Sequence, residues 1–416
     1  MYKSPRGTAD ILPEEQKYWL FLEQKIAEIT QMYGYRLIET PVFEDSSLYT
    51  RTTGEYTDIV QKEMYTFEDR GGNSLSLRPE GTPSVCRAYI QHGLQNQPQP
   101  VKLYYVTSIF RYDRPQAGRW RQHHQFGCEA IGDADPALDA EIIEIAWRLY
   151  EAAGLKDISI QMNSIGCRKC RPAHLEALVS HYSGDKDILC PDCKNRLVNN
   201  PLRLLDCKQP QCQHLANSAP KSGDYLCEEC REHLEQVEEY LHLLEIPYHM
   251  NHRLVRGLDY YSKTVFEPMP EDDRAQAALG GGGRYDYLIE ELGGKPTPGV
   301  GFAAGIERII LNMKKQSVEV PPLPSPKVLI AYMGDEAKKQ AVRLTSDLRK
   351  AGISTVNAAS GKSLKAQLKQ ANTLGVSYTV ILGEEEVKNG TAGLRDMTNA
   401  SQETVPYDKL PELLKK

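Results

Sequence analysis

The sequence predicts an α+β protein in which an antiparallel sheet flanked by helices is followed by a small α/β domain. Residues 101–113 and 123–132 have strand-like composition and are joined by a polar, arginine-rich loop, as expected of an antiparallel hairpin. Residues 137–155 have apolar side chains at helical spacing and end at Gly154. After residue 327, strand-like and helix-like segments alternate, which predicts the α/β domain.

Segments on either side of this hairpin also carry helix and strand signals. Residues 14–32 place apolar side chains at helical spacing and end in a turn at Gly34. An extended stretch, residues 35–43, follows, with Pro41 where a strand would finish. Residues 159–166 predict a further strand of the same sheet.

Composition shifts along the chain predict its domain organisation. We expect a first domain at 1–324, interrupted by a helical insertion at 167–246 that holds eight of the ten cysteines. A helix is predicted from about 303 to 314. The segment 317–327 contains four prolines and predicts a stiff linker. The second domain, α/β, is then 325–416.

Charge and hydropathy restrict the class of protein. The net charge is −6, yet residues 325–416 carry 14 Lys and Arg against 10 Asp and Glu, which favours a tail that meets a polyanion, although four charges also suit an ordinary solvated surface. No run of eighteen apolar residues is present, so we expect no membrane span. The N-terminus lacks a secretory signal pattern, which predicts a cytoplasmic protein with reduced thiols.

The predicted hairpin at 110–132 carries the strongest functional signal. It holds four arginines, namely Arg111, Arg114, Arg119 and Arg121. A solvated basic turn is the simpler interpretation, but Arg111 falls in an otherwise apolar strand, where a charge needs a partner. Gln125 and Glu129 lie four residues apart on the returning strand and share one face of the sheet. A positive rim with an amide and a carboxylate behind it suits a polyphosphate beside an amine or imidazole.

These residues resemble the second motif of class II aminoacyl-tRNA synthetases. The other two class motifs also match in order: helix 14–32 with the following extended stretch resembles the dimer-forming first motif, and GVGFAAGIERIIL (299–311) resembles the third. RPEGT (78–82), RGLDYYSKTVFE (256–267) and GGGRYD (281–286) are similar to signatures of the histidyl-tRNA synthetases. The resemblance covers essentially the whole chain and implies the class II antiparallel sheet, a helical insertion and a C-terminal anticodon-binding domain.

The resemblance assigns residues to ATP. It implies that Arg111 and Arg256 hold the α-phosphate and act in catalysis, that Arg119 holds the β/γ end, and that Arg308 stacks on adenine. His123 stands where the family usually has Phe on the other adenine face, a departure expected to weaken stacking or make it pH-dependent. Asp113 replaces the usual Glu after Phe-Arg-x.

It also assigns residues to L-histidine. Glu80, Thr82 and Gln125 match the residues that take the amino group, and Glu129 and Tyr261 match those that contact the imidazole. A carboxylate and a phenol can satisfy both edges of an imidazole ring, and a wrong side chain would leave them buried and unpaired. A satisfied structural carboxylate is the alternative for either glutamate taken alone.

The implied reaction uses no protein nucleophile. The histidine carboxylate attacks the α-phosphorus of ATP, pyrophosphate leaves, and a terminal ribose hydroxyl of the histidine tRNA then attacks the adenylate. Arginines and Mg²⁺ would stabilise the charge on the phosphate oxygens. The resemblance further implies a homodimer formed through the first motif. In the tail, Lys362, Lys365 and Lys369 are candidate phosphate contacts, or simply solvated lysines.

The cysteines of the insertion fall into four close pairs: Cys167 and Cys170, Cys190 and Cys193, Cys207 and Cys212, Cys227 and Cys230. Two such pairs complete a four-thiolate site, so we expect at least one structural Zn²⁺. Reduced thiols without metal remain the alternative. The first and last pairs flank the insertion and are candidates for a shared site at its base.

Two other classes of protein remain open. A non-catalytic, synthetase-like regulatory subunit of histidine biosynthesis would share the fold, although such proteins usually lose the tail and erode the ATP- and histidine-matching residues. A zinc-dependent nucleic-acid-binding module would explain the cysteines and basic tail but not the motifs. The glycine-rich stretch ALGGGGRYD (278–286) lacks dinucleotide-binding spacing, and SGKS (360–363) lacks the first P-loop glycine. Tyr287 replaces a family glycine with no evident consequence.

Overall fold

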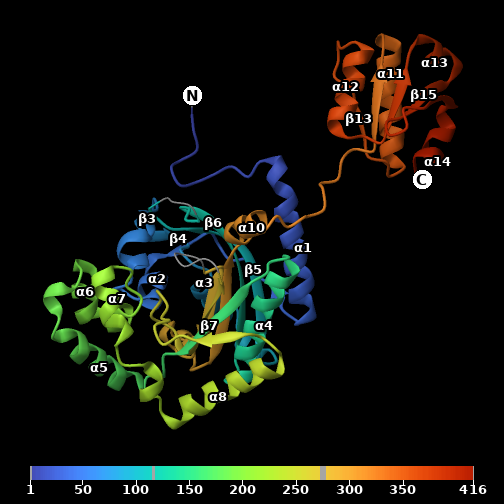
Figure 1. Cartoon of the computed structure of the whole chain (residues 1–416). Coiled ribbons are helices and arrows are strands. Elements are labelled where there is room, and N and C mark those ends of the chain that lie inside the picture. The colour runs from blue at the N-terminus through green and yellow to red at the C-terminus, as the bar shows by residue number, and fades with distance from the viewer. Residues whose placement is uncertain (1, 115–117, 272–277, 416) are drawn as a thin grey trace. The chain divides into compact units, whose positions relative to one another are not determined.

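The computed structural model of the chain describes residues 2–114, 118–271 and 278–415. The chain divides into two compact units, Met1–Pro321 and Pro322–Lys416. Each unit has its own sheet and its own buried core. We therefore describe the two units separately (Figure 1).

The first unit is built on an eight-stranded sheet with the strand order β1-β5-β6-β11-β10-β9-β7-β8. Its strands are Arg36–Leu37 (β1), Val101–Phe110 (β5), Gln122–Ile131 (β6), Gly299–Gly305 (β11), Gly280–Arg284 (β10), Ser262–Pro270 (β9), Ile158–Ser164 (β7) and Tyr248–Met250 (β8). Neighbours run antiparallel except for the parallel edge pairs β1–β5 and β7–β8. A separate three-stranded sheet has the order β2-β4-β3 and consists of Phe43–Asp45, Ser74–Leu77 and Tyr65–Glu68.

Helices flank this large sheet. Those outside the cysteine-bearing segment are Gln16–Met32 (α1), Ser46–Thr53 (α2), Thr82–Gln91 (α3), Pro136–Ala152 (α4), Leu288–Glu291 (α9) and Ile306–Lys315 (α10). The cysteine-bearing segment adds Arg171–Ser183 (α5), Pro191–Asn199 (α6), Pro210–Asn217 (α7) and Glu228–Leu243 (α8). Local sequence explains the boundaries of α4: Asp135 caps its first turn by accepting from the Ala137 amide, Pro136 occupies the first position, and Gly154 follows its end with φ of 73°.

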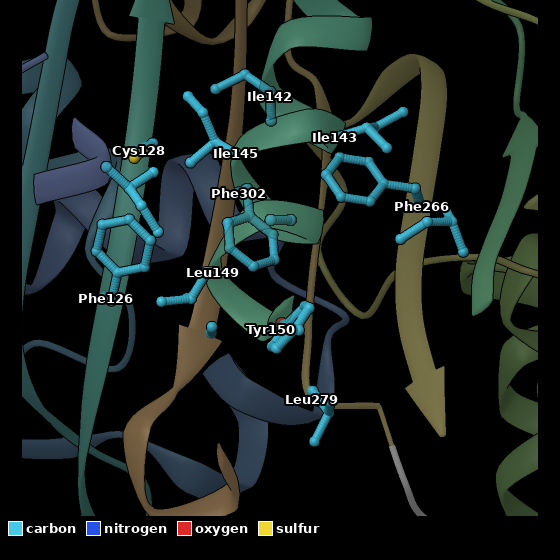
Figure 2. Packing of buried hydrophobic residues seen from close by; sticks show 14 of the residues in the cluster. Phe126, Cys128, Ile142, Ile143, Ile145, Leu149, Tyr150, Phe266, Leu279 and Phe302 are labelled. Atoms are coloured by element: carbon cyan, nitrogen blue, oxygen red, sulfur yellow. The ribbon is translucent and has the colours of Figure 1, made fainter. Parts of the chain in front are cut away.

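One face of the sheet carries the main hydrophobic core. Phe126 of β6, Phe302 of β11 and Phe266 of β9 lie against Leu149 and Ile142 of α4, as Figure 2 shows. All are almost completely buried, and each such side chain contributes about 1.5–3 kcal/mol by leaving water. Because strand residues alternate between faces, this core directs the intervening residues of β6 toward the opposite face, where the candidate site lies.

Three predicted boundaries are wrong. The strand at 101–113 ends at Phe110, so Arg111 lies beyond it, where its Nε donates to the Pro79 carbonyl at 2.7 Å. The helix expected from residue 303 begins at Ile306, because β11 continues its ladder with β6 through Gly305. The extended stretch at 35–43 is interrupted: only Arg36–Leu37 and Phe43 onward form strands, since Pro41 cannot donate a ladder hydrogen bond.

The second unit is a three-layer α/β structure. Its sheet has the order β13-β12-β14-β15-β16, with β15 and β16 antiparallel. The strands are Val328–Tyr332 (β12), Thr355–Asn357 (β13), Tyr378–Leu382 (β14), Thr391–Asp396 (β15) and Gln402–Pro406 (β16). The helices are Asp335–Lys350 (α11), Leu364–Leu374 (α12), Glu384–Asn389 (α13) and Leu410–Lys415 (α14). Residues of α11 and α14 pack on one face of the sheet and those of α12 on the other.

Candidate active site

A cavity of about 270 Å³ lies on the face of the large sheet opposite the main core. Ten of the eleven residues assigned above to ATP and histidine line it, although they are spread from position 80 to position 308: Glu80, Thr82, Arg111, Asp113, Arg119, His123, Gln125, Arg256, Tyr261 and Arg308. The eleventh, Glu129, lies directly behind the wall and accepts a hydrogen bond from Thr82 Oγ1 at 2.6 Å. The structure thus brings the whole predicted set together.

Guanidinium groups define one end of the cavity. Arg119 pairs with Asp113 at 3.0 Å, and Arg256 pairs with Glu267. Arg308 is anchored by donating to the carbonyls of Gly118 and Ala278, at 3.1 and 2.8 Å. Positive charge is therefore held in place by backbone carbonyls and by carboxylates that line the same cavity.

The other two arginines of the hairpin do not line the cavity. Arg121 stacks on Tyr112, with its guanidinium carbon 3.7 Å from the ring centroid, and Arg114 is exposed. Residues 115–117, the middle of the predicted polar loop, lie outside the described residues. The basic character of the hairpin is thus divided between the cavity and the surface.

Buried carboxylates define the opposite end. Glu129 is completely buried and accepts hydrogen bonds from Thr82 and, at 2.6 Å, from the Tyr285 hydroxyl. Burial raises the pKa of Glu129 to about 8, an effect only partly offset by these hydroxyl donors. Gly301 faces Glu129 so closely that a Cβ there would lie 1.9 Å from its Oε2, which explains the glycine on this strand.

A second carboxylate, Glu80, is held in the same manner. Its two oxygens accept from Thr53 Oγ1 and the Tyr260 hydroxyl, both at 2.6 Å. Burial raises the pKa of Glu80 as well. The hydrogen bonds to Glu80 and Glu129 therefore come from uncharged hydroxyls, and a ligand carrying positive groups would supply the compensating charge.

His123 lines the cavity as a neutral ring. Burial first, and the nearby charges of Arg111 and Arg308 second, lower the pKa of His123 to about 3. The expectation that this residue makes stacking pH-dependent therefore does not hold near neutral pH. Its neighbour His124 is not among the lining residues: its ring packs against Trp19 of the main core, and Nδ1 lies 2.8 Å from Glu307, which does line the cavity.

Sequence reasoning missed several polar residues that line the cavity, among them Tyr105, Tyr260, Tyr285 and Glu267. Tyr105 is buried and points its hydroxyl to Glu129 at 3.4 Å. A buried tyrosine needs a polar partner, so the tyrosines inside apolar or glycine-rich strands were an available signal. Their partners depend on strand register, such as Tyr105 opposite Gly127, which the sequence does not give.

The eight cysteines of the insertion form two groups. Cys167, Cys170, Cys227 and Cys230 make up the first cysteine site, and Cys190, Cys193, Cys207 and Cys212 the second; within each, the sulfur atoms all lie within 4.8 Å of one another. Sulfur–sulfur distances in the first site are 3.7 Å for Cys167–Cys170 and 3.9 Å for Cys167–Cys227. A tetrahedral ion with Zn–S bonds of about 2.3 Å places its sulfurs about 3.8 Å apart, so the donor set and spacing fit Zn²⁺.

Tyr287, which had no evident role in the sequence, packs against the first cysteine site. The guanidinium of Arg168 lies 4.0 Å from the Tyr287 ring centroid, and the Arg168 amide donates to the Tyr287 hydroxyl at 3.3 Å. Where the family usually has glycine, this chain therefore has a side chain that covers the cysteines.

The large antiparallel sheet with a cavity lined by arginines and carboxylates defines a class II aminoacyl-tRNA synthetase. The model of the histidyl-tRNA synthetases matches residues 7–169 and 202–309, and that of the anticodon-binding domain matches 327–416. The chain belongs to the histidyl-tRNA synthetase family. Both the predicted fold class and the predicted family are confirmed.

Individual relatives agree with this family over their full length. A histidine–tRNA ligase of Dehalococcoides mccartyi is 60% identical over 410 residues, covering 99% of this chain and 98% of that protein. One of Desulforamulus reducens is 49% identical over 411 residues, with the same two shares covered. The apo crystal structure of S. aureus histidyl-tRNA synthetase has a TM-score of 0.84 and 40% identity, and covers 100% of both chains. The regulatory-subunit alternative is therefore not favoured.

Among the described residues, none of the helices combines the length and apolarity that crossing a bilayer requires.

Proposed function

We propose that this chain activates L-histidine with ATP to give histidyl-adenylate and pyrophosphate, and then transfers histidine to its tRNA. One observation carries the proposal: a single cavity joins a guanidinium-lined end to an end with two buried carboxylates. The first end suits a triphosphate and the second suits a cationic amine and an imidazole. The two reacting groups would therefore meet between them.

At the first end, Arg111 and Arg256 would hold the α-phosphate, Arg119 the β/γ end, and Arg308 the adenine with His123 on its other face. An oxygen of the histidine carboxylate attacks the α-phosphorus in line. The bond between the α-phosphorus and the oxygen that bridges it to the β-phosphate breaks, and pyrophosphate leaves. Negative charge grows on the non-bridging oxygens during this step. Fixed guanidinium groups stabilise that charge without reorganising.

At the second end, Glu80, Thr82 and Gln125 would receive the amino group, and Glu129 and Tyr261 the imidazole. Tyr261 is buried and lines the cavity, whereas Glu129 reaches it through Thr82 and Tyr285. A substrate without ring nitrogens would leave these groups desolvated and unpaired. Specificity for histidine follows from that penalty.

Synthetases of this family use ATP with Mg²⁺, and the cavity offers carboxylates that suit the ion. Asp113 and Glu267 both line the guanidinium end, with side chains 23% and 22% exposed. Mg²⁺ prefers one or two carboxylates together with phosphate oxygens. The ion would supply further charge neutralisation to the leaving pyrophosphate.

The second unit would contact the tRNA anticodon. Lys362, Lys365 and Lys369 are all exposed, and the last two lie four apart on α12 and therefore on one face. We propose this face as a phosphate contact. The terminal ribose hydroxyl of the tRNA would attack the adenylate carbonyl in the first unit, and AMP would leave.

We also propose a homodimer, formed through the first-motif region. Leu37, Val42, Phe43 and Phe67 are exposed apolar side chains there, and the rings of Phe43 and Phe67 lie 6.3 Å apart. Exposed apolar groups gathered in one region are typical of an interface. Light scattering on the purified chain should give twice the mass of one chain, and a monomer at micromolar concentration would contradict this assignment.

We propose structural Zn²⁺ at the eight cysteines. The two four-sulfur groups fit the ion in donor type and spacing. Such sites need reduced thiols, which suits a protein that works in the cytoplasm. Metal analysis of protein purified without chelators tests this, and a preparation without bound zinc would contradict it.

The decisive test of the activity is ATP–pyrophosphate exchange with each of the twenty amino acids. Exchange should occur with histidine and with none of the other nineteen amino acids. A chain that exchanges with a different amino acid, or with none, would overturn the proposed function.

A further inference from the structure

The first cysteine site lies next to the segment that carries Tyr261, the residue assigned to the imidazole of histidine. We propose that a metal ion at Cys167, Cys170, Cys227 and Cys230 positions Tyr261 and thereby sets the affinity for histidine. The inference rests on the proposed function, because it takes Tyr261 as a histidine-binding residue. A metal ion at the second cysteine site is not expected to change the affinity for histidine.

The first link runs through Arg171. This residue begins α5, directly after Cys170, and its guanidinium donates to the Tyr261 carbonyl at 2.6 Å. The same guanidinium donates to the carbonyls of Ile165 and Gly166, both at 3.1 Å. One side chain thus ties the backbone directly before the first cysteine pair to the backbone of Tyr261, and a charged donor makes such bonds strong.

The second link comes from the other cysteine pair. Glu229, between Cys227 and Cys230, pairs with Lys263 at 2.8 Å. The Lys263 amide donates to the Gly166 carbonyl at 2.9 Å, and Lys263 carbonyl accepts from the Ile165 amide at 2.8 Å. Both cysteine pairs therefore reach the short segment 261–263.

This segment needs external support. Lys263 has φ of 48°, a backbone conformation that a residue with a Cβ adopts only when its surroundings hold it there. Gly166 is equally constrained: its φ is 70°, and a Cβ there would lie 2.8 Å from Cys170 Sγ. A four-coordinate ion would fix the cysteine pairs, and the pairs would in turn fix the strained segment.

The second cysteine site shares a buried core with Tyr261, but in the part of the chain that the structure describes no hydrogen bond joins its stretch to residues 261–263. Its four cysteines come from a stretch of 23 residues, 190–212, within the insertion itself. In the first site, by contrast, the pairs lie at the two ends of the insertion, and sulfurs 60 residues apart, such as Cys170 and Cys230, are 3.8 Å from each other. An ion there would close the insertion onto the start of β9, which directly follows Tyr261.

The test uses full-length Arg171→Ala, which leaves all eight cysteines in place. We expect the variant to keep two zinc ions per chain and the wild-type KM for ATP, while KM for histidine in pyrophosphate exchange rises about tenfold or more, the size typical of a misplaced binding group. Arg168→Ala is the matched control. Its guanidinium also lies beside the first cysteine site, stacked on Tyr287, but it pairs with Glu290 and Glu291 and not with the backbone of Tyr261, so its KM for histidine should stay at the wild-type value.

The cysteine variants extend the test. Cys230→Ser should lose one ion and raise KM for histidine, whereas Cys212→Ser should lose one ion and leave it unchanged. After cobalt substitution, the thiolate-to-cobalt absorption should halve in both. Should a cysteine variant fail to fold, Glu229→Gln, whose side chain is 72% exposed, replaces it and should raise KM for histidine by a smaller factor.

The possible outcomes separate the two proposals. A wild-type KM for histidine in Arg171→Ala with both ions bound would overturn the inference and leave the proposed function intact. Wild-type protein without metal would overturn it as well. Wild-type protein without histidine-dependent exchange would instead show that the proposed function itself has failed.

Discussion

The two ends of the cavity hold charged groups in opposite ways. At the guanidinium end, Arg119 and Arg256 are paired with Asp113 and Glu267, and all four side chains retain some exposure to solvent. At the carboxylate end, Glu80 and Glu129 are buried and hydrogen-bonded to hydroxyl groups. The arginines at the first end can exchange a carboxylate partner for a phosphate. The carboxyl groups at the second end are hydrogen-bonded only to uncharged hydroxyls, so a cationic ligand would be their first ionic partner. The same cavity can thus grip a polyanion and still select a small cationic amino acid.

The largest expected effect tests the guanidinium end. Arg256→Ala should lower the rate of histidine activation about a hundred- to a thousandfold, equivalent to about 2.7–4 kcal/mol, because a fixed donor to the transition state is lost. Single-turnover formation of adenylate measures this. Arg148→Ala, which removes a surface arginine paired with Glu144 and Glu151, is the control. Normal activation by a folded Arg256→Ala protein would remove this residue from the site.

A smaller effect tests the carboxylate end through pH. The pKa of Glu129 is about 8 in the folded protein against an ordinary value of 4.5, so the folded state binds the proton more tightly than the unfolded state. The contribution to stability is therefore present below pH 4.5 and lost as the pH rises toward 8. Between pH 5 and 7 the wild type should lose about 2 kcal/mol of unfolding free energy relative to Glu129→Gln.

Urea unfolding of both proteins without ligand, at several pH values, measures this difference. Glu141→Gln serves as the control, since Glu141 is partly exposed and pairs with Lys102. A difference between wild type and Glu129→Gln that does not change with pH would mean that Glu129 is ionised throughout, and that the two ends do not differ as described.

The smallest effect concerns His123, which lies at the guanidinium end near Arg111 and Arg308. Because the pKa of His123 is about 3, the ring is neutral near pH 7, and His123→Phe should change KM for ATP by less than about fivefold, equivalent to about 1 kcal/mol. The ratio of the two KM values should be constant between pH 6 and 8. A ratio that changes by a large factor across this range would show that the histidine titrates there.

Residue types and their spacing determined much of this protein in advance. Periodic apolar residues placed α1 and α4 correctly to within a few residues, because a helix needs only its own neighbours to define a buried face. The motif around Arg111, Gln125 and Glu129, together with the other class motifs, identified the family, because residue types at a fixed spacing can be matched without knowledge of the fold. The spacing of the four cysteine pairs alone likewise predicted a metal-binding insertion.

Other features depended on contacts between distant segments, and only the tertiary structure decided them. Strand register brings Tyr105 and Tyr285 to Glu129, although Tyr285 lies 156 positions from Glu129 in the sequence. The grouping of eight cysteines into two sites, and the contact from Arg171 to Tyr261 across 90 residues, are equally non-local. The sequence determines which chemical groups a chain possesses, but the burial and the partners of each group arise only when distant segments pack together. Burial and hydrogen-bond partners set the pKa of Glu129, and the contact with Arg171 holds the backbone of Tyr261.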